Sequence, residues 1–244
     1  MQKIVDSIIY FRAYNKKNLI FAHSFLKYLF ITLIYMKIFV IAATQMELNA
    51  VLKNTSFNNI KTVVTGIGML ATATYITQLI IEQKPDIIIQ IGIAGCFDKK
   101  IPLGTVMLVQ QEFYGDLGVT EKGTWYDIFD LKLQKPNTTP HHKKGIVNTH
   151  IKTFNKANLP VVKAVTVNQI TTSKKQIAQL QQCYQPILES MEGMALHFVC
   201  SKFNTPYLQL RAVSNYIGER DKSKWNFSLA FNNLNIALKE IIKV

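Results

Sequence analysis

The residues best suited to chemistry lie in the segment Glu189–Tyr216. Within it, Glu192 stands in a run of small and apolar residues, Met191 to Ala195, where an unpaired carboxylate is expensive to bury. The hydroxyls of a vicinal diol would supply hydrogen-bond donors for that carboxylate. A salt bridge to Arg211 or to a lysine is the alternative.

Further polar side chains are expected at the same place. Asn215 follows an apolar strand expected at Tyr207–Val213, and Glu47 follows a buried strand expected at Lys37–Ala43. Open α/β sheets bind ligands beyond the carboxyl ends of their strands, so we expect both side chains to share a pocket with Glu192. Glu47 could orient a water molecule there; the plainer interpretation is a solvated residue at a helix start.

Glycine-rich segments follow other predicted strands. Gly66-Ile67-Gly68 lacks the third glycine and the acidic partner of a dinucleotide-binding fingerprint, so no cofactor is expected. Gly92-Ile93-Ala94-Gly95 is expected to form a turn whose small residues let the backbone approach a substrate. A turn without any ligand is the alternative.

Composition limits the classes of function. With 244 residues and 48% hydrophobic content, the chain is long and apolar enough for one sizeable folded domain. The net charge of +13 could indicate a nucleic-acid or membrane-surface protein, which is the non-enzymatic alternative. The lysines are scattered, however, and no basic helix or RNA-binding motif accompanies them. We therefore expect a small-molecule partner, with no nucleic acid and no membrane.

The cysteines and histidines indicate neither a disulfide framework nor a metal site. Cys96, Cys183 and Cys200 form no Cys-x-x-Cys pair, which favours reduced thiols in the cytoplasm. No histidine stands at a metal-ligand spacing, so no metal is expected.

Residues 1–35 differ from the rest of the chain. The apolar stretch Leu19–Tyr35 is interrupted by His23, Ser24 and Lys27, which makes it a poor membrane span. Because Met36 opens a clean buried strand, we expect a domain at residues 36–244 and an N-terminal extension at 1–35 that is not part of the fold. An upstream mistranslation is favoured for it over an amphipathic surface helix or an anchor.

From Met36 onward, apolar runs without polar alternation are separated by helical patterns. This order predicts an α/β fold, a single three-layer domain in which helices flank a central, mixed, twisted sheet. Residues 120–150 are expected as a long excursion around the site. The expected strands are Lys37–Ala43, Thr62–Thr65, Asp86–Ile91, Gly104–Gln111, Val161–Val167 and Tyr207–Val213, and the helices begin at Met46, Ala71, Ser173, Met191 and Trp225.

Taken in order, these motifs resemble those of the nucleoside phosphorylase/hydrolase superfamily over nearly all of Met36–Val244. The resemblance implies a purine nucleoside as substrate and a homo-oligomer, most often a dimer. It also implies roles for particular residues: Met191 and Glu192 at the ribose, Asn215 at the base, Glu47 on an attacking water, and Ile93 and Gly95 in substrate binding.

The chain departs from the superfamily pattern at Gln90 and Asn215. Phosphorylases of the superfamily have an arginine at the position of Gln90 to hold phosphate, so water is the expected nucleophile here. Adenine-specific nucleosidases have an aspartate at the position of Asn215. An amide cannot transfer a proton to the base, but its NH₂ group can donate a hydrogen bond to O6 or N7 of a 6-oxopurine.

The residue sequences of three segments resemble those of the futalosine hydrolases: Glu112–Gly118, Glu189–Gly193 and Ser214–Tyr216. That resemblance implies cleavage of the N-glycosidic bond of futalosine, releasing hypoxanthine and dehypoxanthine futalosine in menaquinone biosynthesis. Phe113, Tyr114, Trp125 or a lysine could meet the carboxylated aromatic group of the substrate. The alternatives are a methylthioadenosine/adenosylhomocysteine nucleosidase and a purine nucleoside phosphorylase.

Overall fold

The computed structural model describes residues 36–53 and 60–242. The described residues from 37 to 242 belong to one compact unit. The expectation of an extension at residues 1–35 lies outside the described residues. None of the helices in the described ranges is long and apolar enough to cross a membrane.

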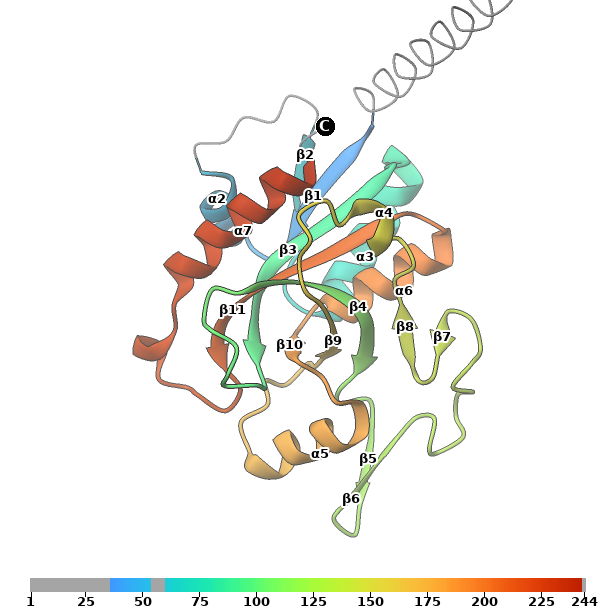
Figure 1. Ribbon diagram of the computed structural model, residues 1–244. Coiled ribbons are helices and arrows are strands. Elements are labelled where there is room, and N and C mark those ends of the chain that lie inside the picture. The colour runs from blue at the N-terminus through green and yellow to red at the C-terminus, as the bar shows by residue number, and fades with distance from the viewer. Residues whose placement is uncertain (1–35, 54–59, 243–244) are drawn as a thin grey trace, which may run out of the picture. The chain divides into compact units, whose positions relative to one another are not determined.

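Within these described ranges the main sheet has nine strands, and the predicted mixed sheet flanked by helices is confirmed (Figure 1). Strands β2, β1, β3 and β11 run parallel in that order, with β2 at the edge, and β11 also pairs antiparallel with β4. The strands β3, β10, β9, β4 and β11 are each paired with the next and close into a ring. The bounds are β1 Ile38–Ala42, β2 Ile60–Val64, β3 Ile87–Cys96, β4 Val106–Tyr114, β8 Gly145–Val147, β7 His141–His142, β9 Val161–Thr166, β10 Leu188–Ser190 and β11 Tyr207–Tyr216.

Helices cover the sheet in pairs: α2 (Gln45–Leu52) packs on α7 (Phe227–Ile242), and α3 (Met69–Gln83) packs on α6 (Gly193–Phe203). Figure 1 shows these pairs on opposite sides of the sheet. The apolar side chains of α3 and α6 meet those of β1 and β3 in one core cluster, which removes them from water. The remaining helices are α4 (Ile151–Phe154), α5 (Lys174–Tyr184) and a 3₁₀ turn at Lys222–Lys224.

Three strands extend further than the sequence pattern predicts: β4, which continues past Gln111 to Tyr114, and β3 and β11. The segment Gly92–Gly95, expected to be a turn, lies inside β3. Glycine is tolerated in a strand where another group comes close, and side chains of Arg211 and Ile217 occupy the positions where Cβ atoms of Gly92 and Gly95 would stand. Strand β11 likewise continues beyond a bulge at Val213, so Asn215 lies within the strand rather than after it.

The excursion at residues 120–150 does not surround the pocket described below, which is a correction to the prediction. It includes the hairpin of β5 (Gly118–Glu121) and β6 (Thr124–Asp127), followed by β7 and β8. Tyr184 of α5 donates its hydroxyl to Asp127 at 3.0 Å, and Lys144 pairs with Asp127 at 3.0 Å and with Asp130 at 2.6 Å. These contacts fix the excursion to α5 and to itself.

Candidate active site

A pocket of about 240 Å³ lies where the carboxyl ends of β1, β3 and β11 meet β10 and the start of α6. It brings together residues that are far apart in the sequence. Those the sequence predicted are Glu47, Ile93, Gly95, Met191, Glu192 and Asn215. Those it did not predict include Thr171, Glu189, Ser190, Ile217, Arg220 and Trp225.

Glu47 is held in place by the start of its own helix. Thr44 is the N-cap of α2, and its hydroxyl accepts from the Glu47 amide while Glu47 Oε2 accepts from the backbone and hydroxyl of Thr44 at 3.2 and 3.1 Å. This reciprocal capping box satisfies amide groups that a helix start leaves free. Glu47 Oε1 lies 3.4 Å from the amide of Ile93 on β3. The carboxylate is therefore buried, oriented and in the pocket wall.

Glu192 occupies the N-cap position of α6 but does not cap that helix. Its Oε1 accepts instead from the amide of Gly68, in the turn after β2, at 2.9 Å. Burial raises the pKa of Glu192, the charge of Arg211 and the Gly68 amide oppose that rise, and the charge of Glu47 adds to it. The two carboxylates therefore interact electrostatically across the pocket.

Arg211 lies behind both carboxylates. It is buried, and its Nη2 donates to Gln90 Oε1 at 2.7 Å. Glu47 Oε1 lies 3.0 Å from the point where a Cβ of Gly92 would stand, and Arg211 Nη1 occupies that same space. Gly92 thus lets the guanidinium and the carboxylate approach. No ion pair within 4.0 Å joins Glu192 to Arg211 in the described structure, so the salt bridge considered from the sequence is not formed.

Asn215 is oriented by its neighbours on β11. The Ser214 hydroxyl donates to Asn215 Oδ1 at 2.8 Å, and Asn215 Nδ2 donates to the carbonyl of Tyr216 at 3.2 Å. An amide nitrogen has two N–H donors, so one remains for a ligand. Nδ2 lies 3.6 Å from the Cβ position of Gly95, which places the amide beside Gly95 in the pocket wall.

Phe113 does not line the pocket, contrary to the prediction. Its ring is buried and stacks on Tyr184 with centroids 5.1 Å apart, in a core cluster with Val165 and Leu180. Tyr114 and Trp125 are absent from the described pocket wall as well. The aromatic and cationic side chains that do reach the pocket are Trp225 and Arg220, whose guanidinium lies 5.5 Å from the Trp225 ring centroid.

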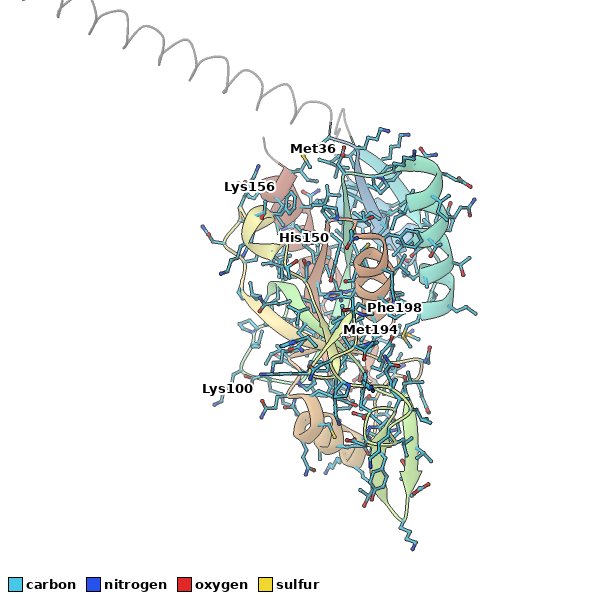
Figure 2. All side chains as sticks on the ribbon, turned by 90° about the vertical axis from the view of Figure 1, so that its right-hand side faces the viewer. Met36, Lys100, His150, Lys156, Met194 and Phe198 are labelled. Carbon is cyan, nitrogen blue, oxygen red and sulfur yellow. The ribbon has the colours of Figure 1, made fainter. Side chains whose placement is uncertain are left out.

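The segment Glu112–Gly118 supports the site from behind rather than contacting a ligand. Glu112 Oε1 accepts from the Thr166 hydroxyl at 2.9 Å, which itself accepts from the amide of Met194 at 2.7 Å. Met194, labelled with Phe198 on α6 in Figure 2, follows Glu192 by two positions. Asp116 accepts from the amides of Asn168 and Gln169 at 2.5 and 3.2 Å. The motif thus fixes the start of α6 and the loop that carries Thr171.

The described residues contain no group of three histidine, cysteine, aspartate or glutamate side chains that could hold a metal ion.

A protein-family model described as the phosphorylase superfamily matches residues 40–243. The chain belongs to this superfamily. It is similar to a futalosine hydrolase of Thermus thermophilus, 24% identical over 204 residues that cover 78% of this chain and 83% of the relative. A 5'-methylthioadenosine/S-adenosylhomocysteine nucleosidase of Aeromonas salmonicida is 30% identical over 158 residues, covering 63% and 67%.

Two solved structures share the fold of this chain. A futalosine hydrolase mutant of Helicobacter pylori has a TM-score of 0.71 at 18% identity, covering 85% of this chain and 99% of that one. The 5'-methylthioadenosine/S-adenosylhomocysteine nucleosidase of the same species has 0.69 at 17%, covering 85% and 98%. These relatives are named hydrolases or nucleosidases, and the predicted enzyme class, an N-glycosidase, is confirmed.

Proposed function

We propose that this phosphorylase-superfamily member hydrolyses the N-glycosidic bond of a 6-oxopurine nucleoside, and that its substrate is futalosine. The products would be hypoxanthine and dehypoxanthine futalosine, in menaquinone biosynthesis. The observation that carries the proposal is that Glu47, Glu192 and Asn215 line one pocket. The similarity to a futalosine hydrolase over most of both chains supports the choice of substrate.

Glu192 acts on the sugar. Its buried carboxylate has one oxygen on the Gly68 amide and lines the pocket with Met191, where the ribose hydroxyls would supply donors. As the bond from C1′ to the base breaks, positive charge develops on the ribose. A fixed carboxylate in a water-poor site stabilises that charge without having to reorganise.

Glu47 acts on water. With Oε2 on Thr44, Glu47 presents Oε1 to the pocket wall beside the Ile93 amide. In the reaction the oxygen of water bonds to C1′, the electrons of the glycosidic bond leave with the base nitrogen, and a water proton passes to Glu47. A phosphate nucleophile would need a cation. Arg220 is the one cationic side chain among the described lining residues and is exposed to solvent, whereas Gln90 is turned to Arg211.

Asn215 acts on the base. The free N–H of its amide donates to O6 or N7 of the purine, where negative charge gathers as the bond breaks. In other enzymes one such positioned donor contributes about 2.7–4 kcal/mol to the transition state. The leaving hypoxanthine then takes its proton from solvent, because an amide cannot provide one.

We further propose that the protein acts in the cytoplasm as a homodimer. Free thiols at Cys96, Cys183 and Cys200 are typical of a reducing compartment. Exposed apolar side chains at Met46, Ile67 and Leu70 lie on and beside the pocket wall, which is where a second copy would cover them.

The purified protein should release hypoxanthine from futalosine at the same rate with and without phosphate. Inosine and methylthioadenosine serve as comparison substrates, and base release is followed by chromatography. Adenine released from methylthioadenosine in preference would favour the nucleosidase alternative, which the 30% identical relative represents. A strict phosphate requirement would show a phosphorylase.

A further inference from the structure

Arg220 is a cation in the pocket wall to which the mechanism above assigns no role. It lies between β11 and the 3₁₀ turn at Lys222–Lys224, is exposed to solvent and lines the pocket. Its acidic neighbours are already engaged, because Lys224 Nζ lies 2.9 Å from Glu219 Oε2 and 4.0 Å from Asp221 Oδ2. Among the described residues no carboxylate forms an ion pair with Arg220. The guanidinium therefore remains available to bind an anion.

The ring of Trp225 holds this guanidinium beside the pocket. The guanidinium carbon of Arg220 lies over the ring, 5.5 Å from its centroid, and the negative face of an aromatic ring attracts a cation. The ring is half-buried, donates its Nε1 hydrogen to the carbonyl of Glu219 at 3.3 Å, and packs on Phe227 with centroids 5.5 Å apart. A planar guanidinium binds a carboxylate through two parallel N–H donors. The pair thus offers a fork of donors next to a flat apolar surface.

The two side chains line a part of the pocket wall that the proposed reaction does not use. In that reaction Asn215 serves the base, Glu192 serves the ribose hydroxyls and Glu47 serves the water. The ribose has one further carbon, C5′, which is attached on the other side of the ring oxygen from the base. A substituent on C5′ is therefore the part of a nucleoside that is left to meet Arg220 and Trp225.

We propose that Arg220 and Trp225 recognise an aromatic acid carried on C5′ of the nucleoside: the guanidinium binds the carboxylate, and the indole packs against the ring that bears it. Futalosine, with its carboxylated aromatic group, has this chemistry, whereas inosine and methylthioadenosine carry no anion there. The inference rests on the proposed function and deepens it, because it assigns the choice between acidic and neutral nucleosides to two residues. A nucleoside 5′-phosphate has an anion without the ring and so distinguishes the two parts of the site.

The test is Arg220→Gln, which removes the charge but keeps a polar side chain. Loss of a charged hydrogen bond should lower the ratio of kcat/KM for futalosine to kcat/KM for inosine about ten- to hundred-fold, through a higher KM for futalosine. Added salt should raise that KM more in the wild type than in the variant. Arg220→Lys keeps the charge without the planar fork and should restore part of the ratio. Lys222→Gln removes a charge from the same exposed segment, outside the described pocket wall, and is the matched control that should leave the ratio unchanged.

Calorimetric binding of futalosine, inosine and inosine 5′-phosphate, in proteins that also carry Glu47→Gln to slow turnover, separates this inference from the proposed function. A loss of affinity in Arg220→Gln that is larger for futalosine than for inosine supports the site, even if the wild type does not cleave futalosine. Equal losses, or no binding of futalosine, overturn it, even if the wild type hydrolyses futalosine.

Trp225→Leu tests the aromatic half of the site in the same assay. It should weaken binding of futalosine more than binding of inosine 5′-phosphate, because only futalosine has a ring to pack on the indole. An equal loss or the reverse order would overturn the assignment to an aromatic acid. A melting curve for each variant confirms that it is folded.

Discussion

At the scale of residues, the site is two carboxylates with one arginine behind them. Glu47 and Glu192 are both buried, and each is fixed by a backbone amide from another element, Ile93 for the first and Gly68 for the second. Arg211 lowers the cost of placing two negative charges in one pocket. Such a site favours a cationic transition state over a neutral substrate.

Glu47→Gln should lower kcat by about a hundred- to ten-thousand-fold while KM changes little, because general-base catalysis is lost and the shape is kept. Steady-state kinetics with the natural nucleoside measure both. Glu82→Gln, on the exposed side of α3, is the control. A Glu47→Gln enzyme within a few-fold of the wild type would exclude the water role.

Asn215→Asp should reduce the preference for 6-oxopurine over 6-aminopurine nucleosides by about ten-fold or more. An ionised carboxylate cannot donate to O6, whereas a protonated one can donate to N7 of adenine. Competition between inosine and adenosine in one reaction measures the ratio. Asn137→Asp, on the exposed excursion, should leave it unchanged, and an unchanged ratio in Asn215→Asp would refute the assignment.

At the scale of elements, helix starts position the carboxylates. The capping box of α2 orients Glu47. Two consecutive hydrogen bonds, from Thr166 to Glu112 and from the Met194 amide to Thr166, fix the first turn of α6 beside Glu192. A Cβ on Gly193 would lie 2.6 Å from Glu112 Oε2, so that turn packs tightly on the buried glutamate. The three-residue strand β10 also contributes to the pocket, because Glu189 is one of its residues.

Thr44→Ala should destabilise the fold by about 1 kcal/mol through loss of the N-cap. It should also lower kcat, since Glu47 Oε2 loses the Thr44 hydroxyl. Ser173→Ala removes the equivalent N-cap of α5, away from the pocket wall, and should cost similar stability with kcat intact. Melting curves and kinetics on both variants decide the matter; equal kcat in the two would show that the cap does not orient Glu47.

At the scale of the whole molecule, a polar cluster is buried behind the site. Glu112, His197, Gln209 and Arg211 are all within the core. Burial raises the pKa of Glu112 to about 7, against the opposing effects of Thr166, Arg211 and Gln209. Burial also lowers the pKa of His197 to about 3. Both groups are therefore favoured in their neutral forms.

The raised pKa of Glu112 makes its contribution to stability complete below about pH 4.5 and lost as the pH rises through 7. Between these two pH values the free energy of unfolding of the wild type should fall by about 3 kcal/mol relative to that of Glu112→Gln, whose side chain stays neutral. The lowered pKa of His197 acts in the opposite direction, stabilising above pH 6.5 and less as the pH falls, but it is common to both proteins. Urea unfolding at pH 5 and pH 8 measures the difference, which would be the same at both pH values if Glu112 did not titrate.

The dimer proposal is tested at the apolar surface around the pocket. Leu70 is 83% exposed at the start of α3. A charge there should break an interface, so Leu70→Glu should shift the protein from dimer to monomer in light scattering. Leu133→Glu, 74% exposed on the excursion, should leave the dimer intact. A wild type that is monomeric would refute the proposal.

The sequence by itself determined the order of the motifs, the main strands and helices, and the chemical identity of Glu47, Glu192 and Asn215. Those features depend only on residues that are close in the sequence. An apolar run indicates a buried strand whatever it packs against, and the chemical groups of a side chain do not depend on the fold. Only the tertiary structure decided that Phe113 belongs to the core, that Gly92–Gly95 continues β3, and that Glu189 and Asn215 are both register partners of Gly95. The reason is that strand register and the closing of the ring depend on residues about a hundred positions apart, and a three-residue strand has no periodicity of its own to reveal it.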